Sequence, residues 1–334
     1  MNRTISRAAF VAVALSASVY GIVACDNDTN ALPPGAGDAG GGTDANTTPP
    51  DSGTTDSAPA DAGSVPVTIT FKAKVGAADF KCGQTYANQG TPGDTVEPRD
   101  LRFFVQDVKL VDSTGKEVPV TLDARAPWQT ADVALLDFED GTGKCSNGNP
   151  ELNDKVTGTV PAGTYTGVVF TNGVPTAINH KDPATEPAPL SAGGMTWGWL
   201  LGHIFIKAEM ASTSSDGGIG LLHLGSVGCT NDPDGGDDFN KSPTSPCSQP
   251  NRNLVKLTGF DPATKKIVLD VGTLFQSTDL TAMSMCHSGG PACPPLFTNV
   301  GLDFDGGARL SAAPAFSSIK CCNIYICCSR YPAL

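Results

Sequence analysis

Two tryptophans and two histidines gather in one stretch of this chain. The whole sequence has 3 Trp and 4 His in 334 residues, and Trp197, Trp199, His180 and His223 all lie between residues 180 and 223. Imidazole nitrogens are good ligands for borderline and soft metals, copper among them. This concentration predicts a binding site, with copper as its metal. Two imidazoles do not complete a metal site, so further donors are expected.

The tryptophan pair is compatible with a binding site and with ordinary core packing. If the segment is a strand, Trp197 and Trp199 project from one face, with Gly198 on the other. His203 shares the tryptophan face only if the strand continues unbroken, and Gly202 could introduce a bulge. Filling a core is the other common use of such a pair, so both interpretations stay open.

The two histidines lie in different contexts. His180 follows the turn-forming segment 173–175, which places it on a loop or at a strand end, where binding residues are often held. His223 alternates with Leu222 and Leu224, so it points away from whatever they bury. A surface or capping role for either histidine is the plainer alternative to a metal ligand.

The elements that must position these residues are mainly strands. In residues 65–75 the odd positions are apolar and the even ones are not, a period of two that indicates one buried and one wet face. Short strands with frequent turns indicate an all-β fold, an antiparallel sandwich or barrel-like domain with long loops. One short helix is expected over 277–285. The other expected strands are 101–111, 118–122, 133–138, 156–160, 165–170, 197–210, 221–224, 254–257 and 267–271.

The N-terminal segment is typical of an exported lipoprotein. Residues 1–24 combine early arginines with an apolar stretch too short for a stable membrane span, and they end before Cys25 in a lipobox-like sequence. We expect cleavage before Cys25 and lipidation of its thiol, with ordinary secretion as the alternative. Residues 25–64 are rich in Asp, Gly, Thr, Ala, Pro and Ser and are expected to be a disordered tether.

The remaining chain is predicted to form one β domain, residues 65–316, followed by an atypical Cys-rich tail, 317–334. The net charge of −12 and the pI near 4.6 argue against nucleic acid and against electrostatic docking on acidic lipid. With the predicted export signal and lipid anchor, we expect a monomer in the periplasm or on the cell surface, attached to the membrane by its lipid anchor alone.

Export to an oxidising compartment makes disulfides the default for the cysteines of the β domain. Several pairings are compatible with the sequence. Local spacing favours Cys229 with Cys247 and Cys286 with Cys293, which leaves Cys82 with Cys145.

Catalytic motifs are missing from the sequence, so no enzyme activity is expected. There is no Gly-x-Ser-x-Gly, no His-Glu-x-x-His, no phosphate-binding glycine loop after a strand, and no Cys-x-x-Cys-His for haem attachment. The acidic loop 231–238 has the carboxylate density of a calcium site without the helix–loop–helix spacing, and a solvated insert is the alternative.

Several strings together resemble one family. Between about residues 71 and 304 the chain is similar to the metallo-mystery pair four-Cys-motif family, the MbnP-type periplasmic copper proteins. The order and spacing of the strings make the resemblance specific. The strings are DLRFFVQDV (100–108), ALLDFED (134–140), VPAGTY (160–165), GVP (173–175) with NH (179–180), WGW (197–199), HLGSVGC (223–229), PNR (250–252), CHSG (286–289) and GLDF (301–304).

The resemblance implies a β-rich secreted protein that binds one copper ion, preferably Cu(I). It also implies a partner, a MauG/MbnH-like di-haem protein that oxidises a tryptophan to kynurenine. Intact indole N–H is only a donor and cannot bind a metal, whereas the opened ring carries an amine with a lone pair. Two imidazoles and that amine form a low-coordinate site suited to Cu(I).

Carried over to this chain, the resemblance implies His180 and His223 as metal ligands and Trp197 or Trp199 as the kynurenine precursor. Trp199 is favoured because it lies nearer the middle of the expected strand. His287 stands beside Cys286 where a methionine is expected, and Met283 and Met285 are alternative soft ligands.

Two other functions are compatible with the sequence. A tethered cell-surface β-sandwich for adhesion or carbohydrate binding, without metal, would use the same lipid, linker and acidic loops. A hydrolase with an unrecognised active site is the third alternative. A modified tryptophan and a di-haem partner would separate the copper protein from both.

Overall fold

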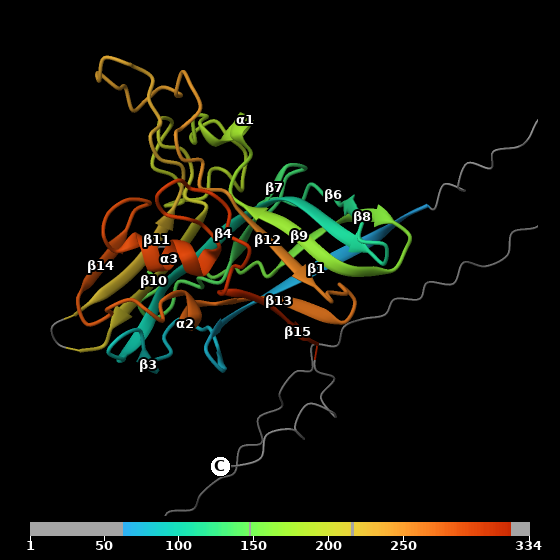
Figure 1. The fold of residues 1–334 in the computed structure, drawn as a ribbon, viewed down its shortest axis with the longest axis horizontal. Coiled ribbons are helices and arrows are strands. Elements are labelled where there is room, and N and C mark those ends of the chain that lie inside the picture. Colours follow the sequence, from blue (N-terminus) through green and yellow to red (C-terminus); the bar gives the residue numbers. More distant parts are fainter. Residues whose placement is uncertain (1–62, 147, 215–216, 322–334) are drawn as a thin grey trace, which may run out of the picture. The chain divides into compact units, whose positions relative to one another are not determined.

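The computed structural model describes residues 63–146, 148–214 and 217–321. The predicted signal peptide, the lipidation site Cys25, most of the tether and the cysteines of the tail beyond residue 321 lie outside the described residues. The described chain is mainly β-strand, with short helices and long loops, which confirms the all-β prediction (Figure 1).

The first sheet has six strands and is built around β1. Its order is β15-β13-β1-β8-β6, and β2 pairs with β1. The pairings are antiparallel except between β1 and β13, which run parallel. Pairing of β15 with β13 carries this sheet past the predicted domain limit at residue 316. The strands are β1 (Ser64–Val75), β2 (Ala78–Asp79), β6 (Thr121–Leu122), β8 (Lys155–Pro161), β13 (Lys265–Asp270) and β15 (Phe316–Lys320).

The second sheet has nine strands and carries the candidate site. Its order is β12-β9-β4-β10-β11-β14, and β3, β5 and β7 also pair with the long strand β4. Only β11 and β14 pair in parallel. The strands are β3 (Tyr86–Gln89), β4 (Asp94–Asp112), β5 (Glu117–Pro119), β7 (Val133–Asp137), β9 (Tyr165–Asn172), β10 (Ile206–Ser212), β11 (Ile219–Leu224), β12 (Asn253–Thr258) and β14 (Met283–Cys286).

The two sheets share one core. Phe71 of β1 packs edge-on against Phe103 of β4 and Phe170 of β9, and Phe316 of β15 contacts the same two rings. All four side chains are buried. Because successive residues of a strand face opposite ways, Phe103 enters this core while Phe104 enters a second, smaller one.

The second core fixes the loops that follow β9. It joins Phe104 and Phe205 to apolar residues of β7 and of the segment between β9 and β10. That segment contains the short helix α1 (Thr176–Asn179) and packs on the side of the large sheet opposite the main core. In Figure 1 α1 and the loop between β11 and β12 lie at one end of the domain. The other members of this core are Val133, Leu135, Val174, Leu190 and Met195.

Two local predictions were wrong. The strand expected from residue 197 begins at Ile206, because Gly198 and Gly202 have φ angles of 104° and 77° that a strand does not accommodate. The segment expected to be helical, 277–285, instead contains β14. The helices beyond α1 are α2 (Val271–Leu274) and α3 (Cys293–Val300), and α3 ends at a left-handed Gly301.

The two disulfides that spacing favoured, and the third pairing that they left, are present in the structure. Cys82–Cys145 closes the longest loop, with a sequence separation of 63, and Cys286–Cys293 links β14 to the start of α3. Cys229–Cys247 joins the two ends of the loop between β11 and β12.

Candidate metal centre

His180 is the C-cap residue that follows α1 and is nearly buried. Its Nδ1 lies 3.0 Å from the carbonyl oxygen of Trp199, and its Nε2 lies 3.0 Å from the side-chain amide of Asn179. A carbonyl only accepts and an amide nitrogen only donates, so these contacts select the tautomer with the proton on Nδ1. Burial lowers the pKa of His180, and the nearby charge of Arg252 acts in the same direction. The ring is therefore neutral, with its proton on Nδ1 and its Nε2 lone pair accepting from the Asn179 amide.

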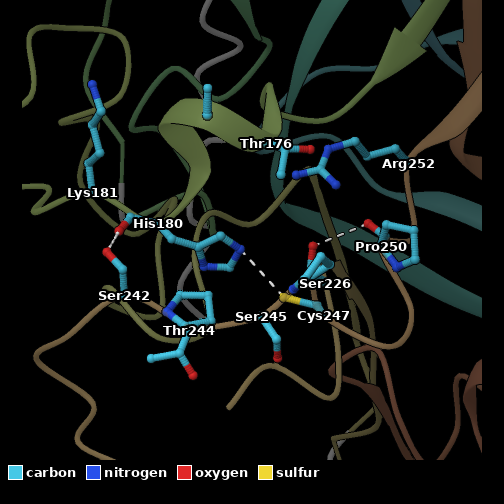
Figure 2. A pocket seen from close by; sticks show the side chains of 13 residues that line it. Thr176, His180, Lys181, Ser226, Ser242, Thr244, Ser245, Cys247, Pro250 and Arg252 are labelled. Carbon is cyan, nitrogen blue, oxygen red and sulfur yellow. Dashed lines mark hydrogen bonds between the residues drawn. The ribbon is translucent and has the colours of Figure 1, made fainter. Parts of the chain in front are cut away.

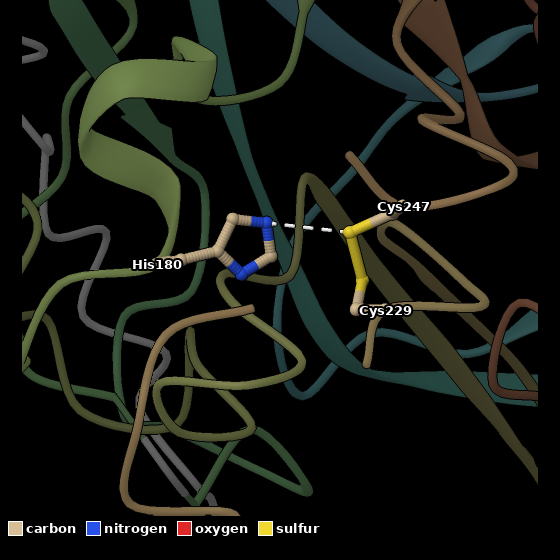
Figure 3. A group of neighbouring side chains, drawn as sticks. All are labelled: His180, Cys229 and Cys247. Carbon is tan, nitrogen blue, oxygen red and sulfur yellow. Dashed lines mark hydrogen bonds between the residues drawn. A yellow bond between two sulfur atoms is a disulfide. The ribbon is translucent and has the colours of Figure 1, made fainter. Parts of the chain in front are cut away.

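The Nε2 edge of the His180 ring also faces a disulfide. Cys247 Sγ is 3.5 Å from Nε2, and the donor atoms of His180, Cys229 and Cys247 lie within 4.8 Å of one another (Figure 3). No other three His, Cys, Asp or Glu side chains within the described ranges converge this closely. The two cysteines are bonded to each other, so neither offers a thiolate in this state.

A cavity of about 430 Å³ opens beside His180 (Figure 2). Its wall combines the end of α1 with the loop that the disulfide closes, and Ser242 Oγ donates to the carbonyl of His180. Arg252 Nε donates to the Val174 carbonyl, its guanidinium lies 5.1 Å from the centre of the Phe205 ring, and burial lowers the pKa of Arg252 to about 10.

The two tryptophans lie on a tight turn instead of a strand. A bridge between Thr196 and His203 closes this turn, and Trp197 N–H donates to the carbonyl of Gly202. The indole of Trp197 lies against Gly225, where a Cβ atom would stand 2.5 Å from Cζ3 of the ring. Trp199 supplies the carbonyl that orients His180. Both tryptophans are partly exposed.

His203 is a buried structural residue. Its Nδ1 and Nε2 are each 3.0 Å from a backbone carbonyl, those of Asn179 and Leu190, and its ring packs edge-on against Phe104. Burial lowers the pKa of His203. The two carbonyl contacts favour the charged form and raise the pKa, but burial has the larger effect. Both ring nitrogens are therefore engaged, so His203 is neither a surface residue nor a free ligand.

His223 lies on the outer face of the large sheet, away from the main core. Its Nε2 is 2.8 Å from Glu209 Oε1 on the neighbouring strand β10, and its ring contacts His287, with 4.7 Å between the ring centres. Burial raises the pKa of Glu209, but the His223 hydrogen bond and the charges of Lys207 and Arg99 outweigh it and lower the pKa overall. An ionised Glu209 accepts from Nε2–H, which leaves the lone pair of His223 on Nδ1.

The buried charges around Glu209 form a network on the same face. Asp100 receives two hydrogen bonds from Arg102 and lies 3.0 Å from Lys207 Nζ, and Arg99 lies 3.4 Å from Glu209. The sequence carries a signal for this network, since Lys207 and Glu209 interrupt an otherwise apolar strand. Buried charges are retained when they are paired, and here they hold Glu209 opposite His223.

The expected site residues thus fall into two adjoining groups. His180 and the Trp199 carbonyl belong to the cavity, whereas His223 and His287 belong to the sheet face. Residues 225 and 226 connect the groups, because Gly225 underlies the Trp197 ring while Ser226 lines the cavity of His180. Sequence reasoning missed Asn179 and Glu209, which orient the two imidazoles.

The acidic loop uses its carboxylates within itself. Asp237 Oδ1 accepts from the hydroxyl of Thr230 and from the backbone N–H groups of Asn231 and Asp232, which lowers the pKa of Asp237. Asp232 accepts from two further backbone N–H groups of the loop. The carboxylates of 231–238 therefore do not converge on a common point, and calcium finds no formed site there.

Within the part of the chain that the structure describes, no helix has the length and apolar character needed to cross a membrane. The fold and the site define a disulfide-linked all-β protein with imidazoles and tryptophans gathered at one end of its larger sheet. A family model described as MbnP matches residues 64–288. This chain belongs to the MbnP family.

A solved structure supports the same assignment. MbnP from Methylosinus trichosporium matches with a TM-score of 0.67 and 30% sequence identity, and the match covers 78% of this chain and 100% of that chain. The comparison with curated proteins gave no match. The expected family resemblance is confirmed over most of the β domain.

Proposed function

We propose that this protein binds one Cu(I) ion where the Trp197 turn meets the sheet, after Trp197 has been oxidised to kynurenine. The observation that carries the proposal is the contact of the Trp197 ring with Gly225, two residues after His223 and on the same face of the chain. His180 and His223 remain the proposed imidazole ligands, one from each of the adjoining groups.

The donor set fits copper. His223 is held with Nε2 hydrogen-bonded to Glu209 and its lone pair on Nδ1, the arrangement that metal-binding histidines adopt. The Nε2 of His180 accepts from the Asn179 amide, and copper would displace that hydrogen bond. Imidazole and an aromatic amine are soft to borderline donors that favour Cu(I) over hard cations. Bound copper would supply a redox-active or transferable ion, and this chain contributes the orientation of the donors.

Oxidation of Trp197 creates the missing donor. With two equivalents of a peroxide oxidant, the C2–C3 bond of the indole breaks, each carbon gains one oxygen, and two waters are released. Hydrolysis then removes C2 as formate and frees the aryl amine. The proposed catalyst is the MauG/MbnH-like di-haem protein that the family resemblance implies.

The geometry favours Trp197 over Trp199, in contrast to the preference expressed from the sequence. Trp197 places its ring on the backbone beside His223, whereas Trp199 contributes its carbonyl oxygen to His180. An amine formed at Trp197 would therefore lie next to the sheet-face imidazole. Trp199 would serve as a positioning residue through its backbone.

The proposal includes an extracytoplasmic location, a lipid anchor at Cys25 and a binding role without enzymatic turnover. A lipid-anchored copper protein would keep its site outside the cytoplasm while the linker 25–64 gives it reach.

Coexpression with the di-haem partner tests the proposal. Peptide mass spectrometry is expected to show a gain of about 4 mass units at Trp197, the change from indole to the amine-bearing ring, and none at Trp199. Trp197→Phe is expected to abolish tight Cu(I) binding in chelator competition, and Trp199→Phe, the matched control, to retain it. Unchanged stoichiometric binding in the double variant His180→Gln, His223→Gln would refute the assignment.

A further inference from the structure

Soft donors gather on the outer face of the edge strand β14. Met283 and Met285 are 59% and 45% exposed, although large apolar side chains are usually buried. Cys286 between Met285 and His287 faces the main core, so alternation places Met285 and His287 together on the outer face. Exposed thioethers beside an imidazole form a surface suited to Cu(I).

The register brings this face onto His223. β14 runs parallel to β11, with Leu221 opposite Met285 and Leu222 opposite Cys286, so the next pair is His223 with His287. The ring centres of these histidines are 4.7 Å apart with planes inclined by 76°. Two of the four histidines of the chain therefore meet at the edge of one sheet.

The backbone around His287 is held on both sides. Cys286 is linked to Cys293 at the start of α3. Ser288 is buried, its hydroxyl donates to the His223 carbonyl, and it accepts from Gly225 N–H at 2.6 Å. The same serine thus ties His287 to His223 and to the glycine under the Trp197 ring, which is the preorganisation a metal site requires.

We propose that His287 is a copper ligand of this protein and shares one Cu(I) ion with His223, with Met285 as the adjacent thioether donor. The inference rests on the proposed copper function and adds a ligand to it. His223 offers Nδ1, because Glu209 engages Nε2. His287 is exposed and turns about its side-chain bonds, so either of its nitrogens can reach the shared ion.

Glu209 is the positioning residue of this pair. It touches His223 and not the ion, and Lys207 and Arg99 lie 3.7 Å and 3.4 Å from its carboxylate oxygens. A carboxylate behind a metal-binding imidazole fixes the tautomer and raises the basicity of the ligand. Glu209→Gln keeps the shape, and we expect it to weaken Cu(I) binding roughly 10- to 100-fold.

Nitrogen-15 NMR of the histidine rings identifies the ligands directly, because Cu(I) is diamagnetic. The experiment uses the coexpressed, mature full chain titrated with Cu(I). The ring nitrogens of His223 and His287 are expected to shift together at one equivalent, with His223 shifting at Nδ1. His203 is the internal reference, since both of its nitrogens face carbonyl groups.

Affinity measurements test the same ligand independently. His287→Ala is expected to weaken Cu(I) binding in chelator competition at least as much as Glu209→Gln, and Met285→Leu is expected to weaken it less. Met283→Leu is the matched control, because Met283 lies one alternation further from His287, and it is expected to leave the affinity unchanged. Circular dichroism of each variant checks that the fold is retained.

The outcomes separate this inference from the proposed function. Tight binding at one equivalent with no shift of His287, and unchanged affinity in His287→Ala, would overturn the inference and leave the copper function standing. Failure of the mature wild-type protein to bind Cu(I) would overturn both. A His287 shift at one equivalent that persists in Trp197→Phe would support His287 as a ligand and overturn the proposed need for kynurenine.

Discussion

The indole ring of Trp197 rests on the backbone of Gly225. A Cβ atom at Gly225 would stand 2.5 Å from Cζ3 of the ring and 2.9 Å from the carbonyl oxygen of His203. Glycine is needed here for space, because its neighbours on both sides cannot retreat without disturbing the Trp197 turn. Gly225 follows His223 by two residues, so the contact brings the Trp197 turn next to the end of β11, where the copper site is proposed.

Gly225→Ala is expected to displace the Trp197 ring and to lower stability by about 1–3 kcal/mol, the usual cost of overpacking. Because the ring is displaced, the yield of kynurenine after coexpression with the di-haem partner should also fall. Peptide mass spectrometry and chemical denaturation measure the two effects. Gly289→Ala is the control, because a Cβ there meets no atom within 4 Å. Equal yields in both variants would mean that the contact does not position the ring.

The Cys229–Cys247 disulfide is expected to hold the cavity of His180 closed. Replacing both cysteines by serine frees a loop of 18 residues, for which chain entropy gives a loss of about 3 kcal/mol. Hydrogen exchange should accelerate across the loop between β11 and β12 and at the end of α1. Cys321→Ser, at an exposed unpaired thiol, is the control. Unchanged exchange in the double variant would show that the loop is held by its other contacts.

Asn179 is expected to orient the His180 ring and, at the same time, to accept the hydrogen bond of the His203 backbone N–H. Its amide contacts His180 Nε2, and its oxygen accepts from the His203 backbone N–H. Asn179→Ala should cost about 1–3 kcal/mol because it leaves the buried N–H unpaired.

Asn179→Asp separates these two roles. It keeps the acceptor for His203 but replaces the donor facing His180 by a carboxylate. The pKa of His180 should therefore rise from its lowered value, and an NMR titration of the ring measures the change. The pKa of His180 remaining where it is in the wild type would argue against the contact between the side chain of residue 179 and the His180 ring.

Asp137 is expected to make stability depend on pH. Burial raises the pKa of Asp137 to about 7, with Asp100 and Glu139 adding to the rise and Arg102 opposing it. The folded state therefore keeps a proton that the unfolded chain loses above its ordinary pKa near 3.8. The free energy of unfolding therefore decreases as the pH rises from about 4 to about 7. Above the folded-state pKa the contribution of Asp137 no longer changes with pH.

Asp137→Asn removes this titration and keeps an oxygen that can accept from Glu139 N–H. Urea denaturation at a series of pH values measures the free energy of unfolding of both proteins. Between pH 4 and 7 the value for the variant should rise relative to the wild type by roughly 1–4 kcal/mol, and the difference should stay constant above that range. A difference that does not change with pH would contradict the raised pKa.

Much of the architecture could be predicted from local pattern. The period-two alternation of β1 and the neighbouring apolar runs predicted an all-β domain, a sandwich or a barrel, because the alternation itself shows that one face of each strand is buried. Cysteine spacing favoured two of the disulfides and left the third pairing. The strand predicted from residue 197 was wrong over its first part, because two glycines with positive φ turn a strand-like sequence into a loop.

The site was only partly predictable. The histidines and tryptophans were recognised by residue type and order, whereas Glu209 on β10 and Asn179 at the end of α1 were not. Their roles depend on which imidazole nitrogen they face, a property of three-dimensional contact. The parallel pairing of β11 with β14, which brings His287 onto His223, joins residues 64 positions apart and has no local signature.

The sequence alone determined the β-rich class, the family resemblance and the set of candidate donors, because these depend on residue type, period and order along the chain. The tertiary structure decided which donors meet. It set His180 against a disulfide and a cavity, and it placed His223, His287 and the Trp197 ring around the Gly225 backbone. The physical reason is that strand register and loop packing bring distant residues together, and only the folded sheet specifies them.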